Sequence, residues 1–352
     1  MPLETSEPSA SAAKCKASPL PIDPRVEECR AEFEPARPPA EGGGWPEPGS
    51  VAVSLLVPVL NEERNLPGCL RRMRWASEIV VVDSDASHDR TVPIAQAFGA
   101  DAYRFCYDRE TGWPKKKNWG LENVPWKNEW VLILDADEYM TPELAREIRD
   151  AVEGRWKPSG KPSAAGCGDG FWINRKFMFM GRWIRGCGYY PSWNVRLLRH
   201  GKGRYERLGT LGDTGSGDNE VHEHILLDAG PAGYLRNDFL HYAYPDLSVW
   251  TEKHNRYSTW EAHAELEGAK GSVHASPLGS PIERRRWLKK ASRGLPFRPT
   301  LRFLYAYFLQ RGFLDGYPGY VMCRLLGWYE LMSIAKRQDM KIKAARGDEM
   351  PT

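Results

Sequence analysis

Cysteine is scarce and irregularly placed in this 352-residue sequence. The chain has seven cysteines, an odd number, and no two of them form a C-x-x-C pair. This pattern argues against a disulfide framework and against a zinc site, so it predicts reduced thiols in the cytosol. The sequence also lacks any run of about 18 or more uncharged apolar residues and any basic-then-apolar signal pattern at its N-terminus. Neither a membrane-spanning helix nor a secretory leader is therefore expected.

The glycine-rich loops that hold nucleotide phosphates in several fold families are missing as well. The first strand-like segment ends in VPVLNEERN, residues 57–65, where a dinucleotide-binding Rossmann domain would have G-x-G-x-x-G. No Walker phosphate loop occurs in the sequence either. Both of these nucleotide-binding classes are disfavoured.

Acidic charge is sparse near the C-terminus. The net charge is only +3, but residues 284–346 contain fifteen Lys and Arg against three acids. Trp, Phe and Tyr are interleaved with these cations, which is typical of amphipathic helices on an anionic membrane surface. Nucleic acid is a rival partner, disfavoured by the high apolar content and by the lack of a nucleic-acid motif. Helices that simply pack on the rest of the protein, with solvated charges, are a further alternative.

Composition and periodicity divide the chain into four regions. Residues 1–48, rich in Pro, Ala, Glu and Ser, predict a disordered tail. Residues 49–245 alternate strand-like and helix-like segments, which predicts βαβ units and a mainly parallel sheet. Residues 246–340 predict a helical, basic and aromatic membrane-associating region, and residues 341–352 a short tail. In the second region we expect strands at 51–59, 78–84, 100–105 and 130–136, and helices at 61–75 (with Asn61 as N-cap), 88–99, 115–124 and 141–152.

Acidic side chains follow the strand-like segments of this array. Asp83 ends the second of them, and the apolar run 130–134 leads into an acidic stretch in which Asp135 and Asp137 form a D-x-D motif. Ligands of open α/β sheets bind beyond the carboxyl ends of the strands. A D-x-D motif there can hold Mg²⁺ or Mn²⁺, which would bridge to the phosphates of a nucleotide. Taken alone, the motif is equally consistent with a solvated strand end or with caps for the next helix.

Three motifs in this order resemble the inverting family 2 glycosyltransferases. They are Asn61-Glu62 after the first strand, residues 83–91 after the second, and residues 135–138 after a later one. The resemblance covers residues 51–245. It implies the GT-A nucleotide-diphospho-sugar transferase fold, an α/β class in which helices flank a Rossmann-like mixed sheet, here with a C-terminal helical extension.

The resemblance implies a donor-binding role for each matching side chain. Asp135 would lie on the donor side of the catalytic centre, and Asp137 would bind the Mg²⁺ or Mn²⁺ that bridges the diphosphate. The second motif, DSDASHDRT, is one residue longer than the usual family pattern, so Asp85 is an alternative to Asp83 for holding the base. The nucleotide-binding set that follows is Pro58, Asn61, Glu62, Asp83, Asp85, Lys117 and Asp135.

Shorter stretches resemble the lipopolysaccharide-core type of hexosyltransferase within that family. They are GWPKKKNWGLENVPWKNEWVLILDADE, VHEHI, HYAY and GFLDGYPGY. The resemblance implies transfer of a hexose from a UDP-sugar to a lipid-linked glycan acceptor such as lipopolysaccharide core. The enzyme would then be cytoplasmic and peripheral on the inner face of the plasma membrane.

An inverting transfer by single displacement needs one base to accept the proton of the acceptor hydroxyl. The resemblance favours Glu223 for this role, with His222 beside it, and Asp218 and Glu220 lie in reserve on the same loop. From the residues alone, VHEHI is better explained as an ordinary alternating strand. His241, in the HYAY stretch, is either a core histidine or one that lines the site.

Two other classes of protein remain as alternatives. The apolar run followed by D-x-D also begins haloacid-dehalogenase phosphohydrolases, in which Asp135 would be the nucleophile. That motif normally continues to Thr or Val at the position of Tyr139, and it normally lies near the start of its domain. A non-catalytic protein that binds glycans or membranes is the other alternative.

Overall fold

The computed structural model describes residues 18–33, 44–108, 113–158, 168–206, 224–266, 276–278, 283, 284, 287, 291 and 295–346. They divide into two compact units. We call them the sheet unit, residues 1–175, 193–205 and 215–241, and the helical unit, residues 176–192, 206–214 and 242–352. Each is described by itself.

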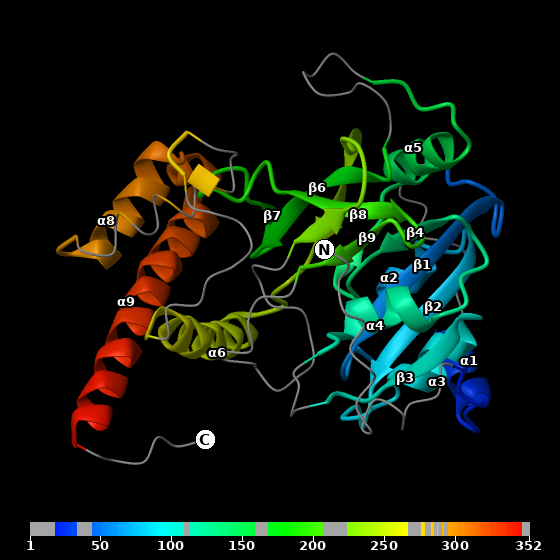
Figure 1. Ribbon diagram of the computed structural model, residues 1–352, viewed down its shortest axis with the longest axis horizontal. Helices are drawn as coiled ribbons and strands as arrows, with labels where there is room; N and C mark the ends of the chain where they lie inside the picture. The colour runs from blue at the N-terminus through cyan, green and yellow to red at the C-terminus, as the bar shows by residue number, and fades with distance from the viewer. Residues whose placement is uncertain are drawn as a thin grey trace, which may run out of the picture. The chain divides into compact units, whose positions relative to one another are not determined.

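The sheet unit is built on a mixed sheet with the strand order β3-β2-β1-β4-β8-β6-β11-β5, and β7 pairs with β6 (Figure 1). Strands β3, β2, β1 and β4 are parallel, and β8 begins an antiparallel half. A separate antiparallel pair joins β9 to β10. The bounds are β1 Val51–Val59, β2 Ala76–Ser84, β3 Asp101–Phe105, β4 Trp130–Ile133, β5 Glu138–Tyr139, β6 Gly170–Phe179, β7 Arg182–Trp183, β8 Trp193–Arg199, β9 Gly203–Tyr205, β10 Ile225–Leu227 and β11 Gly233–His241.

Both faces of the parallel half are buried. Alternate residues of β1 enter different cores, with Leu55 on one face and Leu56 on the other. Apolar residues on both sides of a strand explain its near-continuous hydrophobic sequence, VAVSLLVPV. Residues of four helices join the core of Leu55: α1 Val26–Phe33, α2 Leu66–Arg71, α3 Thr91–Ala97 and α5 Pro142–Val152. The other face holds α4, Lys116–Asn123.

The predicted fold class is confirmed: the protein is α/β, with a mixed sheet flanked by helices and a helical C-terminal region. Local signals placed α5 well, because Thr141 caps it by accepting a hydrogen bond from the Leu144 N–H at 3.3 Å. The first helix differs from the prediction. It begins at Leu66, and Asn61 is no N-cap but a left-handed residue with φ 55°.

The N-terminal segment also differs from the expectation of a tail without structure. Helix α1 lies within residues 1–48, and its Val26 and Cys29 are buried. It packs against α3, and Arg90 next to α3 forms an ion pair of 2.6 Å with Glu32. The composition of the segment did not predict this helix, because the segment is largely polar. Two buried apolar side chains are enough to hold a helix in place when it packs against another helix.

The helical unit is organised around the long helix α9, Gly316–Arg346 (Figure 1). It packs against α6, Leu247–Leu266, and against α8, Arg298–Leu304, which continues into a π-helical turn, Tyr305–Leu309, and a 3₁₀ turn, Gly312–Asp315. Trp250, Met322 and Cys323 lie in its core. Within the described ranges, no helix has both the length and the apolar content that crossing a bilayer demands.

The prediction of reduced cysteines needs one correction. Cys29, Cys69, Cys187 and Cys323 are free and buried. Cys106, however, is part of a disulfide. Spacing along the chain carries no sign of such a bond, which depends only on two Cα atoms approaching within reach in the fold.

Candidate active site at the carboxyl edge of the parallel strands

The loops that follow β1 and β2 are tied together by hydrogen bonds. The Asn61 N–H donates to the Ser87 hydroxyl at 2.9 Å, and the His88 N–H donates to Asn61 Oδ1 at 2.9 Å. The Glu62 N–H donates to the Thr91 hydroxyl at 2.8 Å. Asparagine tolerates the left-handed conformation better than most residues. The two loops therefore form one braced wall at the carboxyl edge of the sheet, beside Pro58 near the end of β1.

Asp83 is buried at the end of β2. Arg104, its neighbour across the β2–β3 pair, donates to Asp83 Oδ2 at 2.8 Å. Burial raises the pKa of Asp83 to about 6, although the Ser87 hydroxyl and the Arg104 guanidinium favour the charged form. Asp85, the alternative, is exposed. The buried carboxylate is the better placed of the two for a directed hydrogen bond.

Asp135, just beyond β4, lies between two cations. Lys117 Nζ is 2.8 Å from its Oδ1, and Arg196 Nη2 is 3.1 Å from its Oδ2. Burial alone would raise the pKa of Asp135, but Lys117 and Arg196 outweigh it and hold the pKa well below its usual value. Asp135 is therefore a permanent anion that positions Lys117.

Glu138 and Arg196 form the buried centre of this cluster. Arg196 Nη2 donates to Glu138 Oε1 at 2.6 Å, and Glu138 Oε2 accepts from the Asp135 N–H at 2.9 Å. Burial raises the pKa of Glu138 against the opposing charge of Arg196. No sequence motif pointed to Arg196. A signal was present, because an arginine within the apolar strand WNVRLLR needs an acidic partner once it is buried.

Asp137 faces a histidine from a distant strand. Short strand β5 pairs antiparallel with β11, which sets His241 opposite Glu138. The His241 Nε2 atom lies 3.5 Å from Asp137 Oδ1, and both side chains are largely buried. His241 therefore lies beside the acidic stretch and belongs to none of the apolar core clusters among the described residues.

Lys116, next to Lys117, binds the backbone at the end of β1. Its side chain is fully buried, and Nζ donates to the Val59 carbonyl at 2.7 Å, at the end of β1. It also favours the ionised form of Asp83. Helix α4 therefore delivers two lysines to the carboxyl edge, one to the backbone of β1 and one to Asp135.

The fit of this edge to a divalent cation depends on the side chains that could ligate the cation. No three His, Cys, Asp or Glu side chains gather as a metal-binding set in the residues that the structure describes. Both oxygens of Asp135 face cations, so Asp137 with His241 is the better ligand pair. Mg²⁺ commonly keeps several waters and binds one or two carboxylates plus substrate phosphates. The pair fits such an ion when a diphosphate supplies further oxygens.

The candidate base lies outside the described residues, as do His222 and the reserve acids Asp218 and Glu220. The described chain resumes after Glu223, and Ile225 of β10 pairs with Tyr205 of β9. Lys117 Nζ lies 5.5 Å from the centre of the Tyr205 ring. Strand β10, just after Glu223 in the sequence, thus pairs with β9. Tyr205 of β9 contacts Lys117, the lysine that pairs with Asp135.

Comparison with known families decides the class of this site. Residues 54–210 match the family described as Glycosyl transferase family 2. The chain therefore carries a family 2 glycosyltransferase domain over these residues. The match contains most of β1 and all of β2, β4 and β8, and with them Asp83, Asp135 and Arg196. The haloacid-dehalogenase and non-catalytic alternatives are set aside.

Several relatives extend this family match along the chain. The lipopolysaccharide core biosynthesis glycosyltransferase LpsC of Rhizobium meliloti is 27% identical over 298 residues, which are 81% of this chain and 91% of that protein. An uncharacterized glycosyltransferase of Rickettsia bellii is 22% identical over 85% of this chain and 92% of its own. TarS of S. aureus, in a crystal structure with UDP, is 13% identical with a TM-score of 0.38 over 86% of this chain and 93% of that one. A TM-score this low supports no conclusion.

Proposed function

We propose that this glycosyltransferase moves a hexose from a UDP-sugar to a lipid-linked glycan such as lipopolysaccharide core, with inversion at the transferred carbon. The observation that carries the proposal is the set of acids at the carboxyl edge of the parallel strands, all within the residues that match family 2. Asp83 pairs with Arg104, Asp135 with Lys117 and Asp137 with His241. The similarity to LpsC over most of both chains supports a lipopolysaccharide-type acceptor.

The braced wall would hold the nucleoside of the donor. Asp83 would accept a hydrogen bond from the base, since its carboxylate is buried and fixed by Arg104. Pro58, Asn61 and Glu62 would line the ribose side, where Ser87 and Thr91 fix the backbone of the loop. Lys117, held by Asp135, would face the diphosphate as a point charge.

Asp137, with His241 beside it, would hold Mg²⁺ or Mn²⁺ together with oxygens of the donor diphosphate. When bound, the cation would neutralise charge on the leaving nucleoside diphosphate. Glu223 would accept the proton of the acceptor hydroxyl as that oxygen attacks the sugar, and His222 would adjust the basicity of Glu223. Arg196 would keep Asp135 oriented and charged throughout the reaction.

Glu223→Gln is expected to reduce transfer by roughly 100- to 10,000-fold, because the amide cannot accept the proton. Binding of UDP should remain at the level of the unaltered enzyme, since the base acts on the acceptor. Transfer is measured with a panel of radiolabelled UDP-sugars and a lipid-linked glycan acceptor. Asp218→Asn and Glu220→Gln, a few residues away in the sequence, are matched controls. If one of them stops transfer while Glu223→Gln does not, the base has been assigned to the wrong residue.

The donor site should weaken in mildly acidic solution. Because the pKa of Asp83 is raised to about 6, its carboxyl group is increasingly protonated below that pH and loses an acceptor for the base. Affinity for UDP, measured by calorimetry from about pH 8 to about pH 5, should therefore fall as the pH drops through 6. Asp83→Asn should bind UDP weakly with no such dependence. If the pH dependence of UDP binding survives in Asp83→Asn and vanishes in Asp85→Asn, the nucleobase is held by Asp85 and not by Asp83.

Membrane attachment would use exposed aromatic side chains of the helical unit. Phe297, Phe308 and Tyr317 are 81%, 57% and 70% exposed, close in sequence to the exposed cations Arg311 and Arg324. Exposed rings and arginines suit the headgroup region of an anionic bilayer. We therefore propose peripheral association with the inner face of the plasma membrane.

Replacing Phe297, Phe308 and Tyr317 together by Ser should release the protein from anionic vesicles in a sedimentation assay. The loss should be tenfold or more, since burying one large apolar side chain is worth about 1.5–3 kcal/mol. The fold should not suffer, because these rings are exposed. Leu247→Ser, on the exposed side of α6, is the control and should bind normally. Undiminished sedimentation of the triple variant would contradict this surface as the attachment site.

A further inference from the structure

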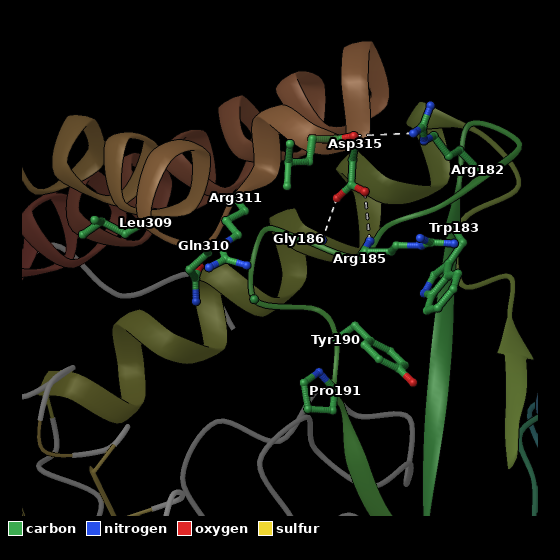
Figure 2. A pocket seen from close by; sticks show the side chains of 12 residues that line it. Arg182, Trp183, Arg185, Gly186, Tyr190, Pro191, Leu309, Gln310, Arg311 and Asp315 are labelled. Atoms are coloured by element: carbon green, nitrogen blue, oxygen red, sulfur yellow. Dashed lines mark hydrogen bonds between the residues drawn. The ribbon is translucent and has the colours of Figure 1, made fainter. Parts of the chain in front are cut away.

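A cavity of about 750 Å³ lies within the helical unit, and none of the residues that line it is assigned above to the donor. One wall is the segment 182–191, which follows β6, and the other is the segment 309–315 between α8 and α9 (Figure 2). Its lining combines guanidinium groups, aromatic rings and a few exposed apolar side chains. Nothing in the proposed donor chemistry uses this cavity.

Three arginines give the cavity its charge. Arg182, Arg185 and Arg311 line it and are exposed. In the part of the chain described, none of them pairs with a carboxylate. The one acid in the lining, Asp315, is already committed to the backbone, because it accepts from the N–H groups of Arg185 at 3.1 Å and Gly186 at 2.6 Å. The cavity therefore presents a net excess of positive charge, because its lining contains three guanidinium groups and one carboxylate.

Two aromatic side chains lie beside these cations. Trp183 and Tyr190 meet edge to face with ring centres 5.0 Å apart. The Trp183 Nε1–H is buried and has no hydrogen-bond partner among the described residues. A buried donor without an acceptor is uncommon and points to a group that is not present. Aromatic faces next to hydrogen-bond donors suit the apolar face and hydroxyls of a sugar ring.

The two walls are held in register before any ligand binds. The Cys187 N–H donates to the Gln310 carbonyl at 2.9 Å. A Cβ on Gly186 would lie 2.6 Å from the Arg311 carbonyl oxygen, so only glycine allows this approach. Arg311 itself has φ 57°, a left-handed conformation that is strained for arginine. Such strain is often found where the direction of a side chain matters for binding.

We propose that this cavity binds the acidic part of the acceptor glycan, a sugar that carries a phosphate or carboxylate group. Guanidinium groups match both groups with paired hydrogen bonds, and Trp183 with Tyr190 would take the sugar ring. The proposal rests on the proposed function, of which it specifies the acceptor class. A phospholipid headgroup would satisfy the arginines alone and leave the aromatic pair without a role.

Binding of glucose 6-phosphate and glucuronate to the full-length protein, measured by calorimetry without any donor, tests the proposal. Both should bind more tightly than glucose and than inorganic phosphate. Arg311→Gly should weaken binding about tenfold or more, the usual effect of losing a hydrogen bond to a charged group. Glycine accepts the left-handed backbone, so this variant should melt no earlier than the unaltered protein. Arg182→Gln should act similarly, and Arg256→Gln, an exposed arginine on α6, should change nothing.

Three results would overturn the assignment. They are equal affinity for glucose 6-phosphate and inorganic phosphate, equal weakening by Arg256→Gln, or loss of binding to phosphatidylglycerol vesicles by Arg311→Gly without loss of acidic-sugar binding. In transfer assays, Arg311→Gly should raise the KM for the acceptor and leave the KM for the donor unchanged. If acidic sugars bind as expected but no UDP-sugar supports transfer, the proposed function fails and the binding site stands.

Discussion

Arg196→Met is expected to destabilise the protein by about 3–5 kcal/mol, the usual cost of removing one member of a buried ion pair. Arg196 is the partner of Glu138, whose side chain is fully buried, and it also contacts Asp135. Methionine fills much of the space but leaves the Glu138 carboxylate without its cation. The loss is measured by urea unfolding at neutral pH, followed through the tryptophan fluorescence.

A second variant separates charge from packing. In Arg196→Met with Glu138→Gln, no unpaired charge is buried, so a large part of the lost stability should return. Transfer should not return with it, because Asp135 and through it Lys117 would still lack their anchor. If the double variant is no more stable than Arg196→Met, the ion pair is not what holds this cluster together.

Asp137→Asn is expected to reduce transfer by roughly 100- to 1000-fold, the range found when a group that stabilises developing charge is removed. The amide keeps the shape of the side chain but is a poor ligand for Mg²⁺ or Mn²⁺. The concentration of Mn²⁺ that gives half-maximal transfer should rise. Initial rates measured against Mn²⁺ concentration show this directly.

The control for that experiment is Glu143→Gln, an exposed acid in the first turn of α5 that is near Asp137 in sequence. It should transfer normally and show the metal dependence of the unaltered enzyme. Normal turnover and normal metal dependence in Asp137→Asn would remove Asp137 from the metal assignment. The same outcome would leave the family and the fold untouched.

The sequence predicted the fold well where hydrophobic pattern and helix capping decide the local structure. The alternation of strands and helices from Val51 to Val152 was predictable because buried parallel strands are nearly continuous apolar runs and α5 begins with a capping Thr141. The start of α2 was not predictable, because the turn at Asn61 is stabilised by hydrogen bonds with Ser87 and His88 from another loop. Helix α1 was missed because its partner, α3, is far away in the chain.

The site divides in the same way. That Asp83 and Asp135 share one edge follows from the sequence, because parallel strands bring their carboxyl ends together. The side chains that each of these acids contacts cannot be predicted from the sequence. Arg104 reaches Asp83, Arg196 reaches Asp135 and His241 reaches Asp137. They do so through the strand pairings β2–β3, β4–β8 and β5–β11, and the pairing register is set by the whole sheet.

By itself, then, the sequence determined the fold class and the order of the acidic motifs, because both depend on spacing and hydrophobic pattern along the chain. Only the tertiary structure decided that Asp135 is a bound anion between Lys117 and Arg196 while Asp137 faces His241. The reason is physical: the charge state and availability of a carboxylate depend on the groups within a few ångströms of it, and those groups come from strands far apart in sequence.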